Sequence, residues 1–154
     1  MEFILRRAKI IDVPEIVKLI NSYAAKGEML ARAHAQVYDA LRDFVVIEEN
    51  DNIVGCGALH VVWSDFGEIR SLAIAEDRKN AGLGRRIVEF LIEDGKALEL
   101  PTIFTLTYKT GFFEKLGFTP IDKKDLPHKV WKDCINCPKF PDCDEMAFVI
   151  SLSK

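Results

Sequence analysis

The residues at positions 78–86 are of the types that bind phosphate. They read Arg-Lys-Asn-Ala-Gly-Leu-Gly-Arg-Arg, so two glycines lie between two basic pairs. A strand-like apolar run (68–75) precedes them, and a helical pattern (84–99) follows. A glycine-containing loop that opens a helix presents unpaired backbone N–H groups at the positive end of the helix dipole. The sequence therefore predicts an anion site suited to phosphates.

The spacing of the glycines argues against two common phosphate motifs. A nucleotide-hydrolysing P-loop continues with Gly-Lys-Ser/Thr, whereas this loop continues Gly84-Arg85-Arg86. A dinucleotide-binding turn needs a third glycine after the first strand, and this Gly-x-Gly lies in the middle of the chain. From spacing alone, an ordinary turn at a helix start remains an equal alternative.

The loop resembles the acetyl-CoA pyrophosphate loop of the GNAT N-acetyltransferases, which reads Arg/Gln-x-x-Gly-x-Gly/Ala. Lys79 stands at the Arg/Gln position, a departure from that pattern. Residues 112–118 are similar to the family's later Tyr-x-x-Gly-Phe segment. Residues 55–60, 67–74 and 106–109 resemble the short, kinase-less N-acetylglutamate synthases of bacterial arginine biosynthesis. The resemblance covers roughly the first 120 residues.

The order of the expected elements predicts one α/β domain over residues 1–154. Strands are expected at 3–8, 44–49, 53–63, 68–75, 103–107 and 146–152. Helices are expected from an N-cap at Asp12 to just before Gly27, and at 30–41, 84–99 and 111–116. The GNAT resemblance implies a mixed central sheet of six to seven strands with about four helices. It also implies that the cofactor lies between two splayed parallel strands, 68–75 and 103–107.

The resemblance also implies which residues contact acetyl-CoA. The pyrophosphate would lie on the glycine loop, and the tetrahedral oxyanion would accept a backbone N–H of the preceding strand. Many GNAT enzymes place a tyrosine general acid where this chain has phenylalanine, which has no proton to donate. The expected cofactor residues are Leu72, Ala73, Ile74, Lys79, Asn80, Ala81, Gly82, Leu83, Gly84, Arg85 and Phe113.

Acetyl transfer to an amine requires a base. Glu68 is the candidate, acting through a water, because it matches the glutamate of the synthase motif Ala/Gly-Glu-Ile. Asp65 is the rival, and a plain surface carboxylate is the alternative. Tyr108 is the available general acid, although an aromatic side chain at a strand end more often packs. The hydroxyl of Thr107 could position a catalytic water. The alternative is that Thr107 is an ordinary β-branched strand residue with no catalytic role.

An amino-acid substrate carries a carboxylate, which arginine binds through two parallel hydrogen bonds. Arg32, Arg70 and Lys109 are the cations in the synthase-like segments, and they form the expected substrate site. Arg70 lies two residues from Glu68, so both should project from one strand face. The alternative is a surface ion pair of little value. Lysine at position 109 lacks the guanidinium fork, which makes glutamine a conceivable acceptor beside glutamate.

A cysteine-rich segment lies within a family-variable tail at about 119–145. Cys134, Cys137 and Cys143 follow His128, a set that could bind zinc. A second Cys-x-x-Cys pair is missing, and the domain does not need a metal to fold, so no metal is expected. Structural or idle thiols are favoured over a metal site or a redox switch.

The composition excludes several classes of partner. The chain is 49% hydrophobic and 29% charged, with a net charge of −3, which argues against binding to nucleic acid or to an anionic membrane. No signal pattern or long apolar run is visible, and four cysteines then indicate a cytoplasmic protein. The predicted function is acetylation of the α-amine of L-glutamate (or L-glutamine), the first step of arginine biosynthesis, by an enzyme that could form a homodimer. The alternatives are a GNAT enzyme for another small amine or a protein N-terminus, and a non-catalytic acyl-CoA-binding or metal-sensing module.

Overall fold

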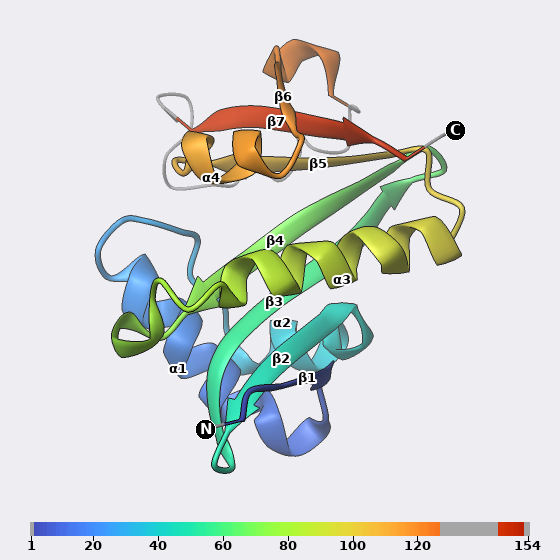
Figure 1. The fold of residues 1–154 in the computed structure, drawn as a ribbon. Helices are drawn as coiled ribbons and strands as arrows, with labels where there is room; N and C mark the ends of the chain where they lie inside the picture. Colours follow the sequence, from blue (N-terminus) through green and yellow to red (C-terminus); the bar gives the residue numbers. More distant parts are fainter. Residues whose placement is uncertain (1, 127–144, 153–154) are drawn as a thin grey trace. The chain divides into compact units, whose positions relative to one another are not determined.

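A computed structural model describes residues 2–126 and 145–152. Seven strands form one mixed sheet in the order β1-β2-β3-β4-β5-β7-β6 (Figure 1). The chain divides into two compact units, Met1–Leu59 with Arg70–Leu91 and His60–Ile69 with Ile92–Lys154. The α/β class and the strand number predicted from the sequence are both confirmed.

The first unit contains β1 (Ile4–Arg7), β2 (Phe44–Glu49), most of β3 (Asn52–Trp63) and the end of β4 (Phe66–Ile74). Strand β1 pairs with β2, and β2 pairs with β3. Asn50 and Asp51 join β2 to β3 with φ of 50° and 67°. Two left-handed residues in a two-residue loop match the right-handed twist of a hairpin, and asparagine and aspartate tolerate this conformation.

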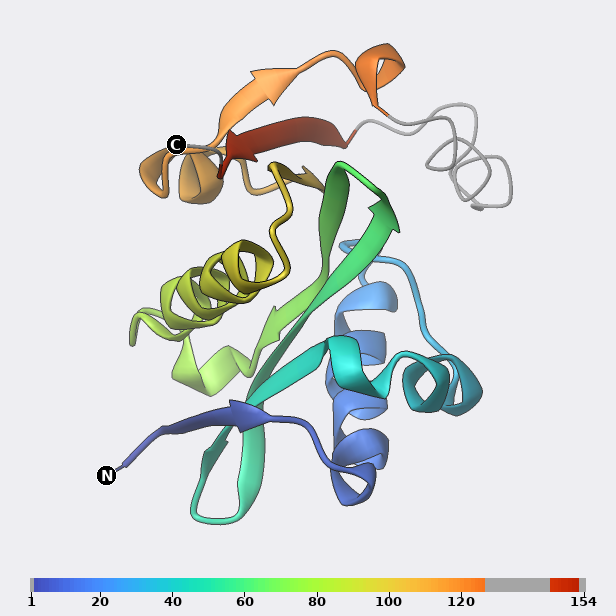
Figure 2. The same cartoon turned by 90° about the vertical axis from the view of Figure 1, so that its right-hand side faces the viewer.

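Two helices cover opposite faces of β3 in this unit (Figure 2). Cys56 and Ala58 belong to the core beneath α1 (Val13–Ala24). The alternate residues, Gly55 and Gly57, face α3 (Leu83–Ala97). A Cβ at Gly57 would lie 2.7 Å from Cγ2 of Ile87, so only glycine lets the helix pack this closely. The strand is therefore buried on both faces over residues 54–59.

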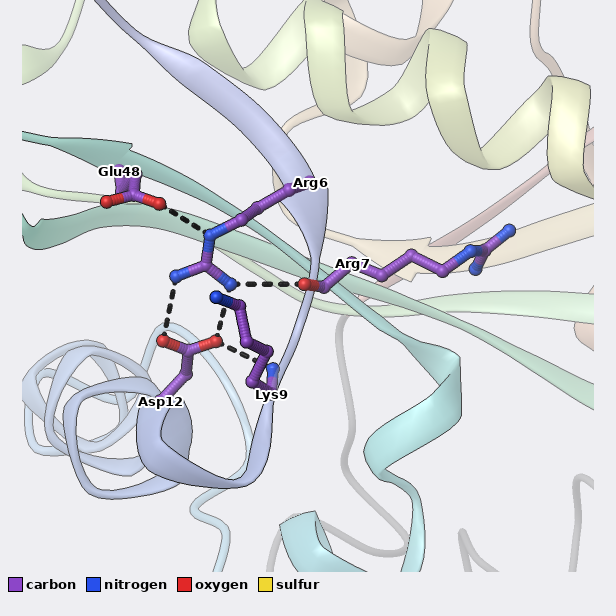
Figure 3. Close-up of polar contacts among 5 residues, drawn as sticks. All are labelled: Arg6, Arg7, Lys9, Asp12 and Glu48. Atoms are coloured by element: carbon purple, nitrogen blue, oxygen red, sulfur yellow. Dashed lines mark hydrogen bonds and ion pairs between the residues drawn. The ribbon is translucent and has the colours of Figure 1, made fainter.

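Asp12 precedes α1, as predicted, but does not cap the helix with its side chain. Its carboxylate accepts hydrogen bonds from Arg6 Nη1 at 2.7 Å, Arg6 Nη2 at 3.0 Å and the Lys9 backbone N–H at 2.7 Å (Figure 3). Arg6 Nε also donates to Glu48 at 2.6 Å. The stronger charge-assisted bonds thus take the place of the cap and tie β1 to the start of α1 and to β2.

The end of α1 follows its prediction closely. Gly27 has a φ of 73°, its N–H donates to the Ala24 carbonyl, and the Glu28 N–H donates to the Tyr23 carbonyl. This pair of bonds is the Schellman motif, which ends a helix at a left-handed glycine.

The helix expected at 30–41 is shorter than predicted. Helix α2 spans His34–Asp39, and a 3₁₀ turn, η2 (Leu41–Asp43), follows it. Ala33 is extended (ψ 157°), and Leu30 is 43% exposed, so the apolar stripe does not begin at 30. The physical reason is the Arg32 backbone, which bonds to the side chain of Asn21 rather than to a helical turn.

The second unit contains β5 (Thr102–Thr107), β6 (Thr119–Ile121), β7 (Met146–Ser151) and α4 (Thr110–Lys115). Strand β5 runs parallel to the start of β4, with Glu68 opposite Phe104, and antiparallel to β7. Strand β6 pairs with β7 and was not predicted, because three residues are too few for a periodic pattern. Phe104, Val62, Leu126 and Ala147 form the core of this unit.

Two further 3₁₀ turns are η1 (Ile10–Asp12) and η4 (Lys123–Asp125). In the part of the chain that the structure describes, no helix combines the length and the apolar character needed to cross a membrane.

Candidate functional site

The predicted phosphate loop connects β4 to α3. The chain leaves β4 through the 3₁₀ turn η3 (Glu76–Arg78). Asn80 and Gly82 then adopt left-handed conformations, with φ of 70° and 75°, and residues 79–82 are exposed. Left-handed residues in a turn are typical of anion-binding nests, in which successive backbone N–H groups point to one side. We interpret this loop as such a nest, placed at the α3 N-terminus, where the helix dipole favours an anion.

The four cations of this loop differ in their partners. Arg78 Nε donates to Glu49 Oε1 at 2.6 Å, and the Glu49 side chain is only 2% exposed. Arg85 Nε lies 3.3 Å from Glu89 on the α3 surface, and Arg86 donates to the Phe3 carbonyl at 3.4 Å. The Arg78 side chain therefore anchors η3 to β2, whereas the weak surface pair of Arg85 can be exchanged for a phosphate.

Lys79 lies between Glu76 and the ring of Tyr23, a residue of helix α1. Its Nζ lies 3.2 Å from Glu76 Oε2 and 5.1 Å from the centre of the Tyr23 ring. Partial burial lowers the pKa of Lys79, but Glu76 and Tyr23 raise it by more, and the pKa ends above its ordinary value. Lys79 therefore keeps its positive charge at neutral pH. At the position of the family's arginine or glutamine, Lys79 thus provides a positive charge, and its contact with a pyrophosphate stays a prediction.

Strand β4 carries an irregularity that the sequence did not indicate. Ser71 has a φ of 56° within the strand, a conformation that costs energy for a residue with a side chain. The Ser71 carbonyl accepts a hydrogen bond from Cys56 Sγ, 3.4 Å away. A left-handed residue redirects the N–H and carbonyl groups that follow it. The irregularity thus comes directly before Leu72, Ala73 and Ile74, where a backbone N–H is expected to bind the oxyanion.

The end of β4 is held by Tyr23 of helix α1. The Tyr23 ring is buried, and its hydroxyl donates a hydrogen bond to the Ile74 carbonyl. Burial raises the pKa of Tyr23, so the hydroxyl stays protonated and remains a donor at neutral pH. An aromatic residue in an apolar helix stripe carries no signal of this role.

The predicted substrate cation Arg32 lies in the segment between α1 and α2. Its backbone N–H donates to Asn21 Oδ1 at 3.0 Å, and its carbonyl accepts from Asn21 Nδ2 at 3.1 Å. The side-chain amide of Asn21 therefore binds both the backbone N–H and the backbone carbonyl of Arg32. Arg32 itself is half-buried.

The candidate base and its neighbour lie in β4. Glu68 and Arg70 are both half-buried and two residues apart, which places them on one face of the strand. Asp65, the rival base, is exposed in the turn before β4. Their shared strand face agrees with the spacing, and the roles of Glu68 and Arg70 in binding and catalysis stay predictions.

The remaining candidates lie at the end of β5 and in α4. Thr107 is buried, and its Oγ1 accepts the Lys109 backbone N–H at 2.8 Å, which shapes the strand end. Tyr108 is 39% exposed, and Lys109 is exposed. Phe113 is 3% exposed and packs edge-on against Phe112 and Phe118. Its ring thus belongs to the interior of the second unit.

The cysteine-rich segment, with His128, Cys134, Cys137 and Cys143, lies outside the described residues. Within residues 2–126 and 145–152, no three His, Cys, Asp or Glu side chains come together as a metal site. Cys56 is buried, as predicted, and burial raises the pKa of its thiol to about 12.

Comparison with known proteins identifies the class. The model of the acetyltransferase (GNAT) family matches residues 14–118. An uncharacterised N-acetyltransferase of Chlorobaculum tepidum is 38% identical over 96% of both chains. The chain therefore belongs to the GNAT acetyltransferase family. It is an acyltransferase, and acetyl-CoA is its acetyl donor.

More specific relatives are amino-acid acetyltransferases. The protein of that name from Mycobacterium tuberculosis is 39% identical over 84% of this chain and 76% of its own. The crystal structure of Rv2747 from M. tuberculosis, in complex with CoA and NLQ, has a TM-score of 0.83 and 33% identity, covering 97% of this chain and 99% of that chain.

The N-acetylglutamate synthase of Neisseria gonorrhoeae, complexed with coenzyme A and N-acetyl-glutamate, has a TM-score of 0.89 at 26% identity. This match covers 100% of the present chain but only 36% of the synthase. The longer relative therefore contains much that this chain does not match.

Proposed function

We propose that the protein transfers the acetyl group of acetyl-CoA to the α-amine of L-glutamate, the first step of arginine biosynthesis. The observation that carries the proposal is the whole-chain match to the gonococcal synthase complexed with coenzyme A and N-acetyl-glutamate. The M. tuberculosis amino-acid acetyltransferase supports the same class of acceptor. Arg32, Arg70 and Lys109 supply the cations for two carboxylates.

In the proposed reaction, Glu68 accepts a proton from the substrate ammonium group through a water. The neutral nitrogen attacks the thioester carbonyl, and the oxyanion accepts a backbone N–H from Leu72, Ala73 or Ile74. The carbon–sulfur bond then breaks, the CoA thiolate leaves, and the nitrogen of the new amide gives its remaining extra proton to water or to the thiolate. Phe113 supplies no proton, so the thiolate leaves unassisted or takes a proton from Tyr108.

The test is thiol release from acetyl-CoA with a panel of free amino acids. Turnover selective for glutamate is expected. In Glu68→Gln, kcat should fall about 100-fold, the ordinary value of a general base, while acetyl-CoA binding is kept. Asp65→Asn is the matched control and should stay near wild type. Unchanged turnover in Glu68→Gln would refute the assignment of the base.

Glutamine is the second candidate acceptor, because Lys109 lacks the bidentate fork of arginine. A higher kcat/KM for glutamine than for glutamate would change the substrate but keep the mechanism. Tight acetyl-CoA binding with no turnover of any amino acid would instead favour another amine or a non-catalytic role.

A further inference from the structure

We propose that Asn21 and Tyr23, in the last turn of α1, are positioning residues for the two substrates of the reaction. Asn21 would position the acceptor segment, and Tyr23 would position the acetyl-CoA strand. The inference rests on the proposed function, because it takes Arg32 as an acceptor ligand and residues 72–74 as cofactor contacts.

The geometry of the helix separates the two roles. Residues two positions apart on an α-helix point in different directions, since each residue turns the helix by about 100°. Asn21 turns toward the segment between α1 and α2, and Tyr23 toward the end of β4. A single helical turn thus holds two segments that lie 11 and 51 residues away in the sequence.

Asn21 fixes the conformation of the acceptor segment. Its two bonds to the Arg32 backbone, at 3.0 and 3.1 Å, use both its carbonyl and its amide group. Alanine at this position would remove both bonds and release the Arg32 main chain. The guanidinium would then lose part of the preorganisation that makes carboxylate binding favourable.

Tyr23 fixes the acetyl-CoA strand in two ways. Its hydroxyl donates to the Ile74 carbonyl, and its ring lies beneath Lys79 Nζ at 5.1 Å. Glu76 accepts Lys26 Nζ at 2.7 Å and Lys79 Nζ at 3.2 Å, which links the end of α1 to the start of the phosphate loop. Phenylalanine would keep the ring but lose the hydroxyl, which bonds to the Ile74 carbonyl and also interacts with Lys79. Tyr23→Phe therefore tests the polar contacts of the hydroxyl apart from the packing of the ring.

The experiment measures acetyl-CoA dissociation constants by calorimetry and amino-acid KM by thiol release, after far-UV circular dichroism has established folding. Tyr23→Phe should weaken acetyl-CoA binding about 10-fold, the value of one lost hydrogen bond, and leave the amino-acid KM within about twofold. Asn21→Ala should show the opposite: an amino-acid KM raised about 10-fold with unchanged acetyl-CoA binding. A general loss of structure would move both constants together.

The control is Ser22→Ala. Ser22 lies between the two residues, and its exposed hydroxyl bonds to the Leu19 carbonyl of its own helix at 2.7 Å. Both constants should stay at wild-type values in this variant. If Asn21→Ala does not fold, Asn21→Asp keeps the bond from the Arg32 N–H, and the amino-acid KM should still rise about threefold.

The outcomes separate the inference from the proposed function. Wild-type acetyl-CoA binding in Tyr23→Phe overturns the role of Tyr23, whichever acceptor the enzyme uses. Wild-type amino-acid KM in Asn21→Ala overturns the role of Asn21. Failure of the wild-type enzyme to acetylate any amino acid refutes the proposed function and the Asn21 role with it, and acetyl-CoA binding still decides the Tyr23 role.

Discussion

Asp12 is a buried carboxylate of the first unit that forms an ion pair with Arg6. Its side chain is 4% exposed and faces Arg6, which is 21% exposed and also bonds to Glu48. The hydrogen bonds from Arg6 lower the pKa of Asp12, and they outweigh the burial that would raise it. A carboxylate paired in this way contributes to stability only while it is ionised.

The pH dependence of stability follows from this pair. The folded-state pKa of Asp12 lies below its unfolded value of about 3.9, so its stabilisation is complete above that pH and is lost as the pH falls through the folded-state pKa. Asp12→Asn should lower the free energy of unfolding at pH 7 by about 3 kcal/mol, because Arg6 loses a buried partner. The variant should also lose less stability than wild type below pH 4.

Urea unfolding between pH 3 and 7 measures both effects. Glu15→Gln, an exposed acid in the first turn of α1, is the control and should change stability by less than about 0.5 kcal/mol. Parallel pH curves for Asp12→Asn and wild type would contradict the assignment.

Gly82 matters through its backbone conformation rather than its size. Its φ is 75°, and a Cβ there would meet nothing within 4 Å. Gly82→Ala should therefore cost about 1 kcal/mol of stability through left-handed strain alone. Acetyl-CoA binding should weaken as well, because relief of that strain turns the N–H groups of the nest away from the phosphates.

The matched control is Gly27→Ala. Gly27 has nearly the same φ, 73°, and equally open surroundings, but ends α1 rather than opening α3. Thermal unfolding should show similar losses for the two variants, and calorimetry should show weaker acetyl-CoA binding for Gly82→Ala only. Equal binding losses would show that strain in general, not the phosphate loop, is responsible.

At the scale of elements, a buried ion pair sets the path of η3 into the phosphate loop. Arg78 bonds to Glu49, whose second oxygen, Oε2, is buried without a hydrogen-bond partner among the described residues. Loss of Arg78 would leave that carboxylate buried and unpaired.

Arg78→Met should therefore lower the free energy of unfolding more than Arg85→Met does, although both variants remove one cation from the same loop. The partner of Arg85 is exposed, and such a pair contributes little. Urea unfolding of the two variants makes the comparison. The double variant Arg78→Met with Glu49→Gln should regain part of the loss, and no regain would exclude the unpaired carboxylate as the cause.

At the scale of the whole molecule, the described residues form the seven-stranded sheet and the four α-helices of a GNAT domain. Three of the four cysteines lie outside the described residues. The sequence predicts that these thiols hold no metal. Protein purified without added zinc should contain far less than one equivalent of zinc by elemental analysis. A full equivalent that a Cys134→Ser variant loses would contradict this prediction. The cytoplasmic location and the homodimer also stay predictions of the sequence.

The sequence alone determined the class of protein and most of its elements. Among the described residues, period-two and helical patterns located six of the seven strands and the four α-helices, because burial on one face requires a regular spacing of apolar residues. The sequence placed the helix end at Gly27 and a turn at Gly82, and glycine readily adopts the left-handed φ that both positions have. The phosphate loop stays a prediction, which the sequence allows because its glycines and cations are contiguous.

The tertiary structure decided the features that join distant segments. The local sequence does not predict the left-handed Ser71, the hydrogen bond from Tyr23 to Ile74, the hydrogen bonds between Asn21 and Arg32, or the Arg78–Glu49 ion pair. Each depends on residues that are neighbours only after folding, so serine, tyrosine and asparagine there look like ordinary strand or helix residues. The late start of α2 has the same cause, because the Asn21 side chain competes with the helix for the Arg32 backbone.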